Sequence, residues 1–356
     1  MNIAINTLPL STEHRMRGTG VYTKNLIDAL TKYEKSHSYS FFTRLNDIPK
    51  KTDVVHFPFF DPFFLTLPFF KQYPTAVTVH DLIPLVFPDK FPAGVRGKVK
   101  LQMQKISLMG AKGIITDSMC SKSDIIRLIG MPEERVHVVP LAPSPLYTKA
   151  KSADAIDGVR TRYRLPHQYV LYVGDVNWNK NVPGLLRAWK QVRAKQPKQS
   201  DLKLVLAGSA FTDAELPETR NILREIEVLG ISKSVVRSGF VKNEDMAALY
   251  AGAKCTVLPS WHEGFGFPVL ESMACGTPVV ATNRGSVPEI AGPALIADPG
   301  DAAALTRAIR EAVSLSPASR KAMVKAGLEW AKKFTWKTVA HDTAVSYERV
   351  LGTTSL

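Results

Sequence analysis

Short apolar runs alternate with stretches of helical periodicity along the chain, and they form two series. Strands that alternate with helices are typical of a parallel sheet covered by helices. The expected strands are NIAIN, SYSFFT, DVVHF, TAVTVH, KGIITD and RVHVVP at residues 2, 38, 53, 75, 112 and 135, and then YVLYVG, LKLVLAG, VVRSGF, CTVLP, TPVVAT and ALIAD at residues 169, 202, 235, 255, 277 and 294.

The rhythm stops between Leu141 and Pro166, in a segment rich in Pro, Ser and Ala. We therefore expect one domain over residues 1–150, a second over 151–335, and a C-terminal helix over 336–356. The predicted fold class is α/β, with two doubly wound, Rossmann-like domains facing each other across a cleft and a helical tail. Ligands of such sheets bind at the carboxyl ends of the strands, near topological switch points.

Composition narrows the class of partner. The chain has 46 Lys and Arg against 32 Asp and Glu, a formal net charge of +14. Up to Ala150 there are 19 basic and 12 acidic residues, and after it 27 and 20, so each half carries +7. No basic run interleaved with stacking aromatics, no zinc spacing and no RNA-binding motif occurs, so nucleic acid is not expected as a partner.

Cysteine usage and hydropathy indicate where the protein resides. Cys120, Cys255 and Cys275 form no CxxC pair, which favours a reducing compartment. The N-terminus is typical of a strand, not a secretion signal. The most apolar stretch, residues 57–70, contains three prolines and is too short to span a membrane. We expect a cytoplasmic protein.

Two neighbouring segments suggest an anionic membrane surface as a partner. Residues 90–105 carry five cations, and apolar residues recur among them at helical spacing. They predict either a basic amphipathic helix at an anionic bilayer or lipid diphosphate, or a surface helix that packs its apolar stripe on its own domain. The aromatic segment 57–70 is either an exposed cluster at the inner membrane face or a loop whose rings fill the core.

The longest motif is PSWHEGFGFPVLESMACGTPVVATNRGSVPEI, from Pro259 to Ile290. It predicts a strand end, a glycine turn and a helix. Gly264 and Gly266 allow close approach to the helix-start amides near Phe265 and Phe267, as a phosphate requires. Glu263 before the turn and Glu271 two helical turns beyond it supply carboxylates, which accept hydrogen bonds from vicinal hydroxyls of a sugar or a ribose. A nucleotide sugar would use all three features.

This block resembles the retaining, GT-B type glycosyltransferases of family four, the group 1 glycosyltransferases. The resemblance implies that Glu263 contacts the donor sugar, that Glu271 contacts the nucleotide ribose and that amides of the GFGF turn meet the diphosphate. It also implies that residues 1–150 form the acceptor-side domain, that residues 151–335 bind the nucleotide sugar, and that the C-terminal helix crosses back to the first domain.

The segment YVGDVNWNKN resembles the family's donor-phosphate segment, in which a lysine neutralises the diphosphate. Lys180 holds that position. The chain has no Asp-x-Asp metal motif, so the charge of the leaving group must be met by cations and helix dipoles. Many relatives place an arginine nearby where this chain has Asn179 and Asp175. Arg15, Arg17 or Arg284 could supply the second cation.

Two further segments complete the predicted site. Gly18 and Gly20, between the first strand and a helix, form a lone GxG. They predict either a simple loop that lets the helix start or, as the resemblance implies, a loop that approaches the donor phosphates and the acceptor. His80 and Asp81 end a strand in TAVTVHDLIPLVFP. The HDL(x)P(x)xFP pattern resembles a subgroup that often transfers mannose, in which this histidine faces the reacting sugar. We assign His80 as a hydroxyl partner, with Asp81 to orient it.

The resulting hypothesis is a retaining, metal-independent hexosyltransferase with His80, Lys180 and Glu263 as its catalytic residues. It would move a hexose, mannose favoured, to a polyprenol-linked or growing glycan in surface polysaccharide synthesis. The donor is a substrate and no cofactor is expected; a GDP-sugar is favoured and a UDP-sugar is the alternative. Competing interpretations are a nucleotide-sugar epimerase of the same fold, a glycoside phosphorylase, and a non-catalytic nucleotide-sugar or membrane-binding protein.

Overall fold

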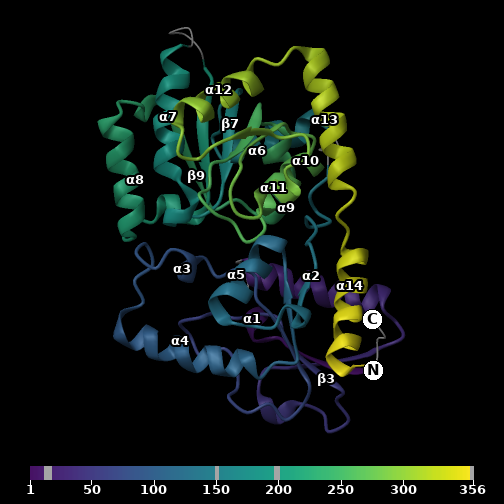
Figure 1. Ribbon diagram of the computed structural model, residues 1–356. Coiled ribbons are helices and arrows are strands. Elements are labelled where there is room, and N and C mark those ends of the chain that lie inside the picture. Colours follow the sequence, from purple (N-terminus) through teal and green to yellow (C-terminus); the bar gives the residue numbers. More distant parts are fainter. Residues whose placement is uncertain (12–17, 149–151, 196–200, 353–356) are drawn as a thin grey trace. The chain divides into compact units, whose positions relative to one another are not determined.

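The computed structural model describes residues 1–11, 18–148, 152–195 and 201–352. The chain forms two compact units (Figure 1). Unit 1 comprises Met1–Ala142 and Phe334–Leu356, and unit 2 comprises Pro143–Lys333. The boundary expected between residues 150 and 151 lies outside the described residues. The candidate cations Arg15 and Arg17 lie outside them as well.

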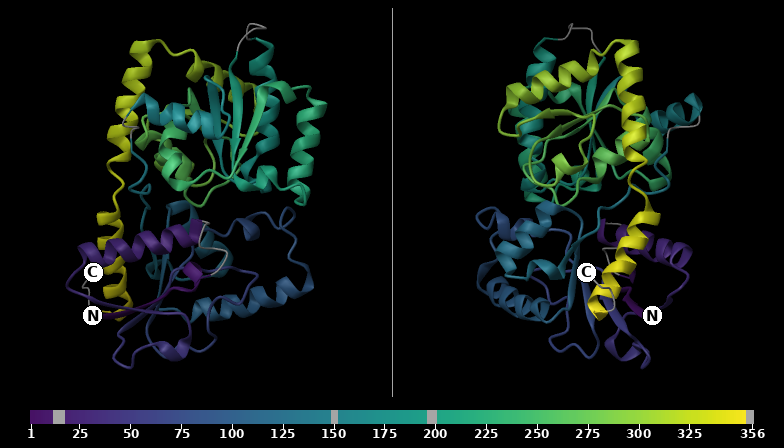
Figure 2. Two further views of the ribbon diagram at one scale, coloured as in Figure 1. Left: turned by 180° about the vertical axis from the view of Figure 1, so that it is seen from behind. Right: turned by 45° about the vertical axis from the view of Figure 1, so that its right-hand side comes forward.

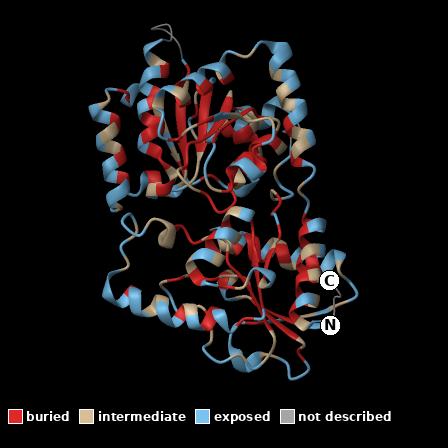
Figure 3. Cartoon of the chain, in the orientation of Figure 1, coloured by how far each residue is buried: buried red, intermediate tan, exposed pale blue. Residues whose placement is uncertain are grey.

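Unit 1 is built on a parallel six-stranded sheet of order β2-β1-β3-β4-β5-β6. The strand order reverses beside β1, which places a topological switch point between β1 and β3. Buried apolar residues fill its core (Figure 3). The strands are β1 (Asn2–Asn6), β2 (Ser38–Phe42), β3 (Val54–Phe57), β4 (Thr75–Thr78), β5 (Gly113–Thr116) and β6 (Val136–Val138).

Helices cover this sheet, and one of them comes from the C-terminal part of the chain. That helix, α14 (Trp336–Leu351), packs against α2 (Gly18–Tyr33) and against strands β3, β4 and β5 (Figures 1 and 2). Gly113 permits this approach, since a Cβ there would lie 2.6 Å from Val350 Cγ2. The remaining helices of unit 1 are α1 (Leu8–Ser11), α3 (Ile83–Val86), α4 (Gly94–Met109) and α5 (Met119–Ile129), with 3₁₀ turns η2 (Leu45–Asp47) and η3 (Glu133–Arg135).

Unit 2 repeats the plan with a parallel sheet of order β12-β11-β10-β7-β8-β9 and apolar cores on both faces. Its switch point lies between β7 and β10. The strands are β7 (Tyr169–Val173), β8 (Lys203–Ala207), β9 (Val235–Gly239), β10 (Cys255–Leu258), β11 (Val279–Thr282) and β12 (Leu295–Ala297). The helices are α6 (Ala153–Arg162), α7 (Val182–Ala194), α8 (Pro217–Val228), α9 (Asn243–Ala251), α10 (Phe267–Ala274), α11 (Val287–Ile290), α12 (Ala302–Val313) and α13 (Pro317–Ala331), with 3₁₀ turns η4 (Trp178–Lys180), η5 (Ser209–Thr212) and η6 (Ser232–Ser234).

The predicted α/β class, with two parallel, doubly wound sheets, is confirmed, and each expected strand is present. The interpretation that the apolar stripe of residues 90–105 packs on its own domain is wrong. Val95, Val99 and Ile106 of α4 are exposed, and the residues that the helix buries are Gly97, Gln104, Ser107 and Leu108. Among the described residues, no helix is long and apolar enough to cross a membrane.

Candidate active site

The switch point of unit 2 brings two distant segments together. Strands β7 and β10 are hydrogen-bonded neighbours, so the loops that leave their carboxyl ends run side by side. The first loop contains η4, whose last residue is Lys180, and the second contains Glu263. Trp178 and Trp261, one from each loop, stack with ring centroids 6.1 Å apart and planes inclined by 10°. The predicted donor residues therefore share one site, although they are far apart in sequence.

Lys180 and Glu263 form an ion pair at this site. The ammonium donates to both carboxylate oxygens of Glu263, at 2.9 and 2.8 Å. Ser260 Oγ donates to Oε1 of the same carboxylate at 2.6 Å. Glu263 is buried and Lys180 is half-buried. A carboxylate offers about four lone-pair directions, so Glu263 retains capacity to accept from a sugar hydroxyl.

The backbone around this pair is fixed by polar contacts that the sequence analysis did not identify. Asn179 Nδ2 donates to the His262 carbonyl at 3.1 Å, and the Trp261 amide donates to the Asn179 carbonyl at 2.8 Å. Asn181, which has a left-handed φ of +51°, donates to the carbonyls of Pro259 and Pro299. Asn179, beside Lys180, thus makes a structural contact between the two loops.

The loop after β11 holds Glu263 from the other side. Ser286 Oγ donates to the Glu263 carbonyl at 2.9 Å. Gly285 has φ +60°, and a Cβ there would lie 2.7 Å from the Glu263 amide nitrogen, so only glycine allows this packing. Gly285, Ser286 and Ser260 all lie within the motif quoted above, but their role as supports of Glu263 becomes visible only in the fold. Arg284, a candidate second cation, is paired with Asp298 at 2.7 Å.

The glycine turn leads directly into α10. Gly264, Phe265 and Gly266 are buried, and Phe265 packs edge-on against Phe267. Gly266 adopts φ +95° at the N-cap. The amides of Gly266 and Phe267 donate no hydrogen bond to any residue that the structure describes. A helix N-terminus with such amides favours an anion, as the sequence predicts for the diphosphate.

Glu271 lies on α10 and is half-buried. Burial raises its pKa to about 7, against the opposing effect of a hydrogen bond from Tyr250. Tyr250 Oη donates to Glu271 Oε2 at 2.7 Å, and the Tyr147 ring packs edge-on against the Tyr250 ring. The sequence did not identify Tyr250 as the hydrogen-bond partner of Glu271, because Tyr250 lies on α9, outside the motif.

Unit 1 contains a second cluster, centred on His80 at the end of β4. His80 Nδ1 lies 2.7 Å from Asp117 Oδ2, and Asp117 follows the neighbouring strand β5. Burial lowers the pKa of His80, but Asp117, with smaller effects of Asp81 and a backbone hydrogen bond to Pro58, outweighs it, so the net pKa is raised. The pKa of Asp117 is also raised, because burial disfavours its charge. The pair fixes Nδ1–H toward Asp117, and Nε2 is buried.

The expected role of Asp81, to orient His80, belongs to Asp117. Asp81 was predicted to orient His80, but the carboxylate on His80 Nδ1 is that of Asp117. Asp81 Oδ1 instead accepts from the Ile83 amide at 3.0 Å, at the start of α3. Residues adjacent in a strand point to opposite faces, whereas residues at the same level of neighbouring parallel strands meet.

A buried polar chain lies behind His80. The Tyr22 ring packs edge-on against His80 with centroids 4.5 Å apart, and Tyr22 Oη lies 3.1 Å from Thr78 Oγ1. Thr78 Oγ1 lies 2.8 Å from His56 Nε2, and His56 Nδ1 lies 2.8 Å from Tyr347 Oη. This chain connects the surroundings of His80 to α14, which the sequence did not predict.

The placement of Gly18 and Gly20 was wrong. They were expected in a loop, but α2 begins at Gly18 and both lie in its first turn. Whether they approach a donor phosphate stays a prediction.

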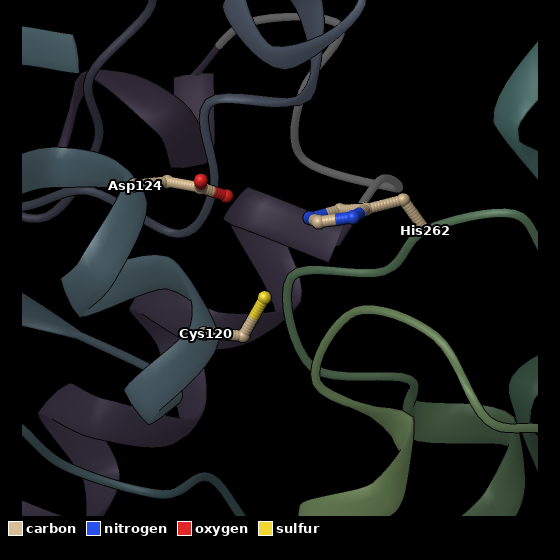
Figure 4. Close-up of side chains that lie close together, drawn as sticks. All are labelled: Cys120, Asp124 and His262. Atoms are coloured by element: carbon tan, nitrogen blue, oxygen red, sulfur yellow. The ribbon is translucent and has the colours of Figure 1, made fainter. Parts of the chain in front are cut away.

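Figure 4 labels three further polar side chains: Cys120 and Asp124, which belong to unit 1, and His262, which belongs to unit 2. On α5, Cys120 and Asp124 lie one turn apart, and the buried Asp124 accepts from Arg127 at 2.6 Å. In unit 2, His262 directly precedes Glu263, on the loop between β10 and α10. The carboxylate of Asp124 therefore has a local cation, and His262 shares the backbone anchor that Asn179 provides.

Comparison with known proteins identifies the family. Residues 161–330 match the family model Glycosyl transferases group 1, and residues 11–142 match Glycosyltransferase Family 4. O-antigen chain mannosyltransferase B of Escherichia coli is 34% identical over 278 residues, which cover 77% of this chain and 70% of that protein. MMP alpha-(1->4)-mannosyltransferase of Mycolicibacterium hassiacum is 30% identical, and the match covers 70% of this chain and 57% of that protein. For the serotype-specific mannosyltransferase WbdA of Escherichia coli, 29% identical, the match covers 78% of this chain but 34% of WbdA.

Solved structures share the fold at lower identity. Sucrose-phosphate synthase of Thermosynechococcus elongatus superposes with a TM-score of 0.76 at 21% identity, covering 99% of this chain and 100% of that one. HepE of Anabaena, solved in complex with UDP and glucose, gives a TM-score of 0.70 at 18% identity, with coverage of 97% and 98%.

Two doubly wound units, one with a cation, two carboxylates and a glycine turn at its switch point, define a glycosyltransferase of the GT-B fold class. The chain belongs to the group 1 glycosyltransferases, as the sequence motifs predicted.

Proposed function

We propose that the protein transfers mannose from GDP-mannose to a hydroxyl of a lipid-linked or growing surface glycan, with retention at the anomeric carbon and without a metal ion. The observation that carries the proposal is the Lys180–Glu263 pair beside the α10 N-terminus at the switch point of unit 2. The choice of mannose rests on the His80 pattern and on the names of the relatives, an O-antigen chain mannosyltransferase among them.

Each group of the site has a part in this reaction. Glu271 would accept from the ribose hydroxyls, and the Gly266 and Phe267 amides would meet the diphosphate. Lys180 would neutralise charge as the bond from the anomeric carbon to the phosphate oxygen breaks. The acceptor oxygen would bond to the same face of that carbon, and its proton would pass to the leaving phosphate oxygen. Glu263 and His80 would hold sugar hydroxyls.

The test combines binding and transfer, with EDTA present throughout. Thermal shifts with GDP, UDP, ADP, dTDP and their sugar conjugates should single out GDP and GDP-mannose, because a ligand that binds only the folded state raises Tm. Transfer of labelled mannose to a polyprenol-linked glycan should give an α-linked product. The one-bond C–H coupling at the anomeric carbon, measured by NMR, would show this configuration. A β-linked product would contradict retention, and loss of transfer in EDTA that Mg²⁺ restores would contradict metal independence.

Variants connect the activity to the site. Glu271→Ala should weaken donor binding and Lys180→Ala should lower turnover. Lys190→Ala, at an exposed position of α7, and Glu244→Ala, at an exposed position of α9, are matched controls. Full transfer by both site variants would remove the assignment, and interconversion of nucleotide sugars without an acceptor would indicate an epimerase instead.

A further inference from the structure

Helix α4 exposes a stripe of apolar residues and buries the polar residues Gln104 and Ser107 together with Gly97 and Leu108. Val95, Val99 and Ile106 are 81%, 56% and 58% exposed, and Met103 and Met109 are exposed as well. At about 100° per residue, their spacing of three or four positions places all five on one face. A helix of a soluble domain normally turns such a stripe toward its core, so this face is left for something outside the domain.

The opposite face of α4 explains why its apolar stripe faces outward. Its buried residues include Gly97, Gln104 and Ser107. Gln104 Oε1 accepts from Thr66 Oγ1 at 3.1 Å, and Ser107 Oγ donates to the Pro68 carbonyl at 2.6 Å. These contacts and the buried Leu108 fix the inward face of the helix and hold residues 57–70, which we call the aromatic loop, along it, so the apolar stripe faces outward.

The aromatic loop adds exposed rings beside the stripe. Phe70 is 87% exposed and Phe64 is 64% exposed, with Leu65 and Phe69 also exposed. Lys100 Nζ lies 5.3 Å from the centroid of the Phe64 ring, which places loop and helix side by side. We call the combined surface the α4–loop surface; its residues are Phe64, Leu65, Phe69, Phe70, Val95, Val99, Met103, Ile106 and Met109. Such a concentration of exposed apolar side chains marks an interaction site.

Cations flank the stripe, and no acid lies on the helix. By helical spacing, Arg96 lies on one side of the stripe and Lys98 on the other, and both are exposed. The sequence of α4 contains neither Asp nor Glu. A second copy of this surface would therefore bring like charges together with nothing to pair them, whereas anionic lipid headgroups would pair with these cations while acyl chains receive the stripe.

We propose that the α4–loop surface docks on an anionic lipid bilayer. The apolar stripe enters the boundary between headgroups and acyl chains, and Arg96 and Lys98 contact the headgroups. This inference deepens the proposed function, since a lipid-linked acceptor is presented at such a surface. The inference rests on the proposed function only for the reason why the protein would dock, because docking itself needs neither donor nor turnover.

The test is co-sedimentation of the full chain with vesicles of phosphatidylcholine, with and without 30 mol% phosphatidylglycerol, in the absence of donor. We expect binding to the anionic vesicles that weakens with salt. The double variant Val99→Glu/Ile106→Glu should lower the partition coefficient at least about tenfold. The control Val228→Glu/Ile296→Glu alters two exposed apolar residues of unit 2 and should bind as the unmodified chain. Arg96→Ala and Lys98→Ala should each weaken binding about fivefold.

A second measurement reports insertion directly. Tryptophan at position 70, as Phe70→Trp, should gain quenching by brominated lipids, and Val228→Trp should not. Equal sedimentation of the Val99→Glu/Ile106→Glu variant and the unmodified chain would overturn the proposal. The proposal would also be overturned if analytical ultracentrifugation showed that the unmodified chain is a dimer and the Val99→Glu/Ile106→Glu variant a monomer, while both bind vesicles equally. Vesicle binding by a chain that shows no transfer would refute the proposed function and leave the docking surface standing.

Discussion

At the scale of single residues, the two clusters consist of polar groups, several of them charged, that are held in pairs. Lys180 and Glu263 are paired at 2.8 Å, His80 and Asp117 at 2.7 Å, and Glu271 accepts from Tyr250. A charge taken out of water without a partner is costly, so each pair makes its members interdependent. Substitution of one member should therefore affect stability as well as turnover.

Replacing Lys180 by methionine should destabilise the protein by about 3 kcal/mol, because Glu263 would keep a buried, unpaired charge. Glu263→Gln in the same chain should recover most of that loss, while transfer stays low in both variants. Urea unfolding of the two single variants and the double variant measures the coupling. Additive effects would show that the two charges do not stabilise each other.

Glu271 should make stability fall as the pH rises. Its pKa is raised from 4.5 to about 7 in the fold, mainly by burial, so the folded chain holds a proton that the unfolded chain has released. The contribution is complete below pH 4.5 and is lost as the pH rises through 7, a change of up to about 3 kcal/mol. Glu271→Gln should flatten this dependence and be more stable than the unmodified chain at pH 8. Urea unfolding from pH 5 to 8 tests it, and the exposed Glu244→Gln should leave the slope unchanged.

Asp117→Asn should lower the pKa of His80, because the raising effect of the carboxylate is lost while burial remains. The NMR titration of His80 Cε1 should then move to lower pH. Turnover should fall at least about tenfold with little change in the KM for the donor, since the ring loses its orienting anion. Asp53→Asn, at the amino end of the same sheet, is the control. An unmoved titration would mean that Asp117 serves packing alone.

At the scale of elements, the strands could be predicted from the sequence and the contacts between strand ends could not. Apolar runs such as YVLYVG and CTVLP mark strands whatever their neighbours are, and each of them formed one. Which strands become neighbours depends on the topology, and β7 beside β10 is what unites Lys180 with Glu263. The same limitation led to Asp81 rather than Asp117 as the partner of His80. Likewise, the orientation of α4 depends on hydrogen bonds that Gln104 and Ser107 form with Thr66 and Pro68 of a loop.

Helix α14 is attached through a histidine that should respond to acid. Burial is the main reason that the pKa of His56 falls from 6.5 to about 3. Its contribution to stability is complete above pH 6.5 and is lost as the pH falls toward 3. Protonation would disrupt the bonds to Thr78 and Tyr347, so hydrogen exchange of residues 336–351 should accelerate below about pH 5. Tyr347→Phe should accelerate the same amides at neutral pH at a cost of about 1 kcal/mol. Exchange that is independent of pH after correction for intrinsic rates would contradict this role.

At the scale of the whole molecule, the two units differ in how the chain builds them. Unit 2 is one continuous stretch, Pro143–Lys333, whereas unit 1 requires α14 from beyond it. The donor residues Lys180, Glu263 and Glu271 all belong to unit 2. Donor binding and the integrity of unit 1 should therefore be separable by dissection of the chain.

Residues 143–333 alone should fold cooperatively, and GDP should raise their Tm, because both apolar cores of unit 2 and the donor site are contained in them. Residues 1–142 alone should not fold, since β3, β4 and β5 would lose the helix that covers them and His56 would lose Tyr347. Joining residues 334–356 to residue 142 through a Gly/Ser linker should restore folding, as circular dichroism and thermal melting would show. Cooperative melting of residues 1–142 without α14 would contradict this account. If residues 143–333 fold but do not bind a nucleotide that the full chain binds, the donor site requires groups of unit 1.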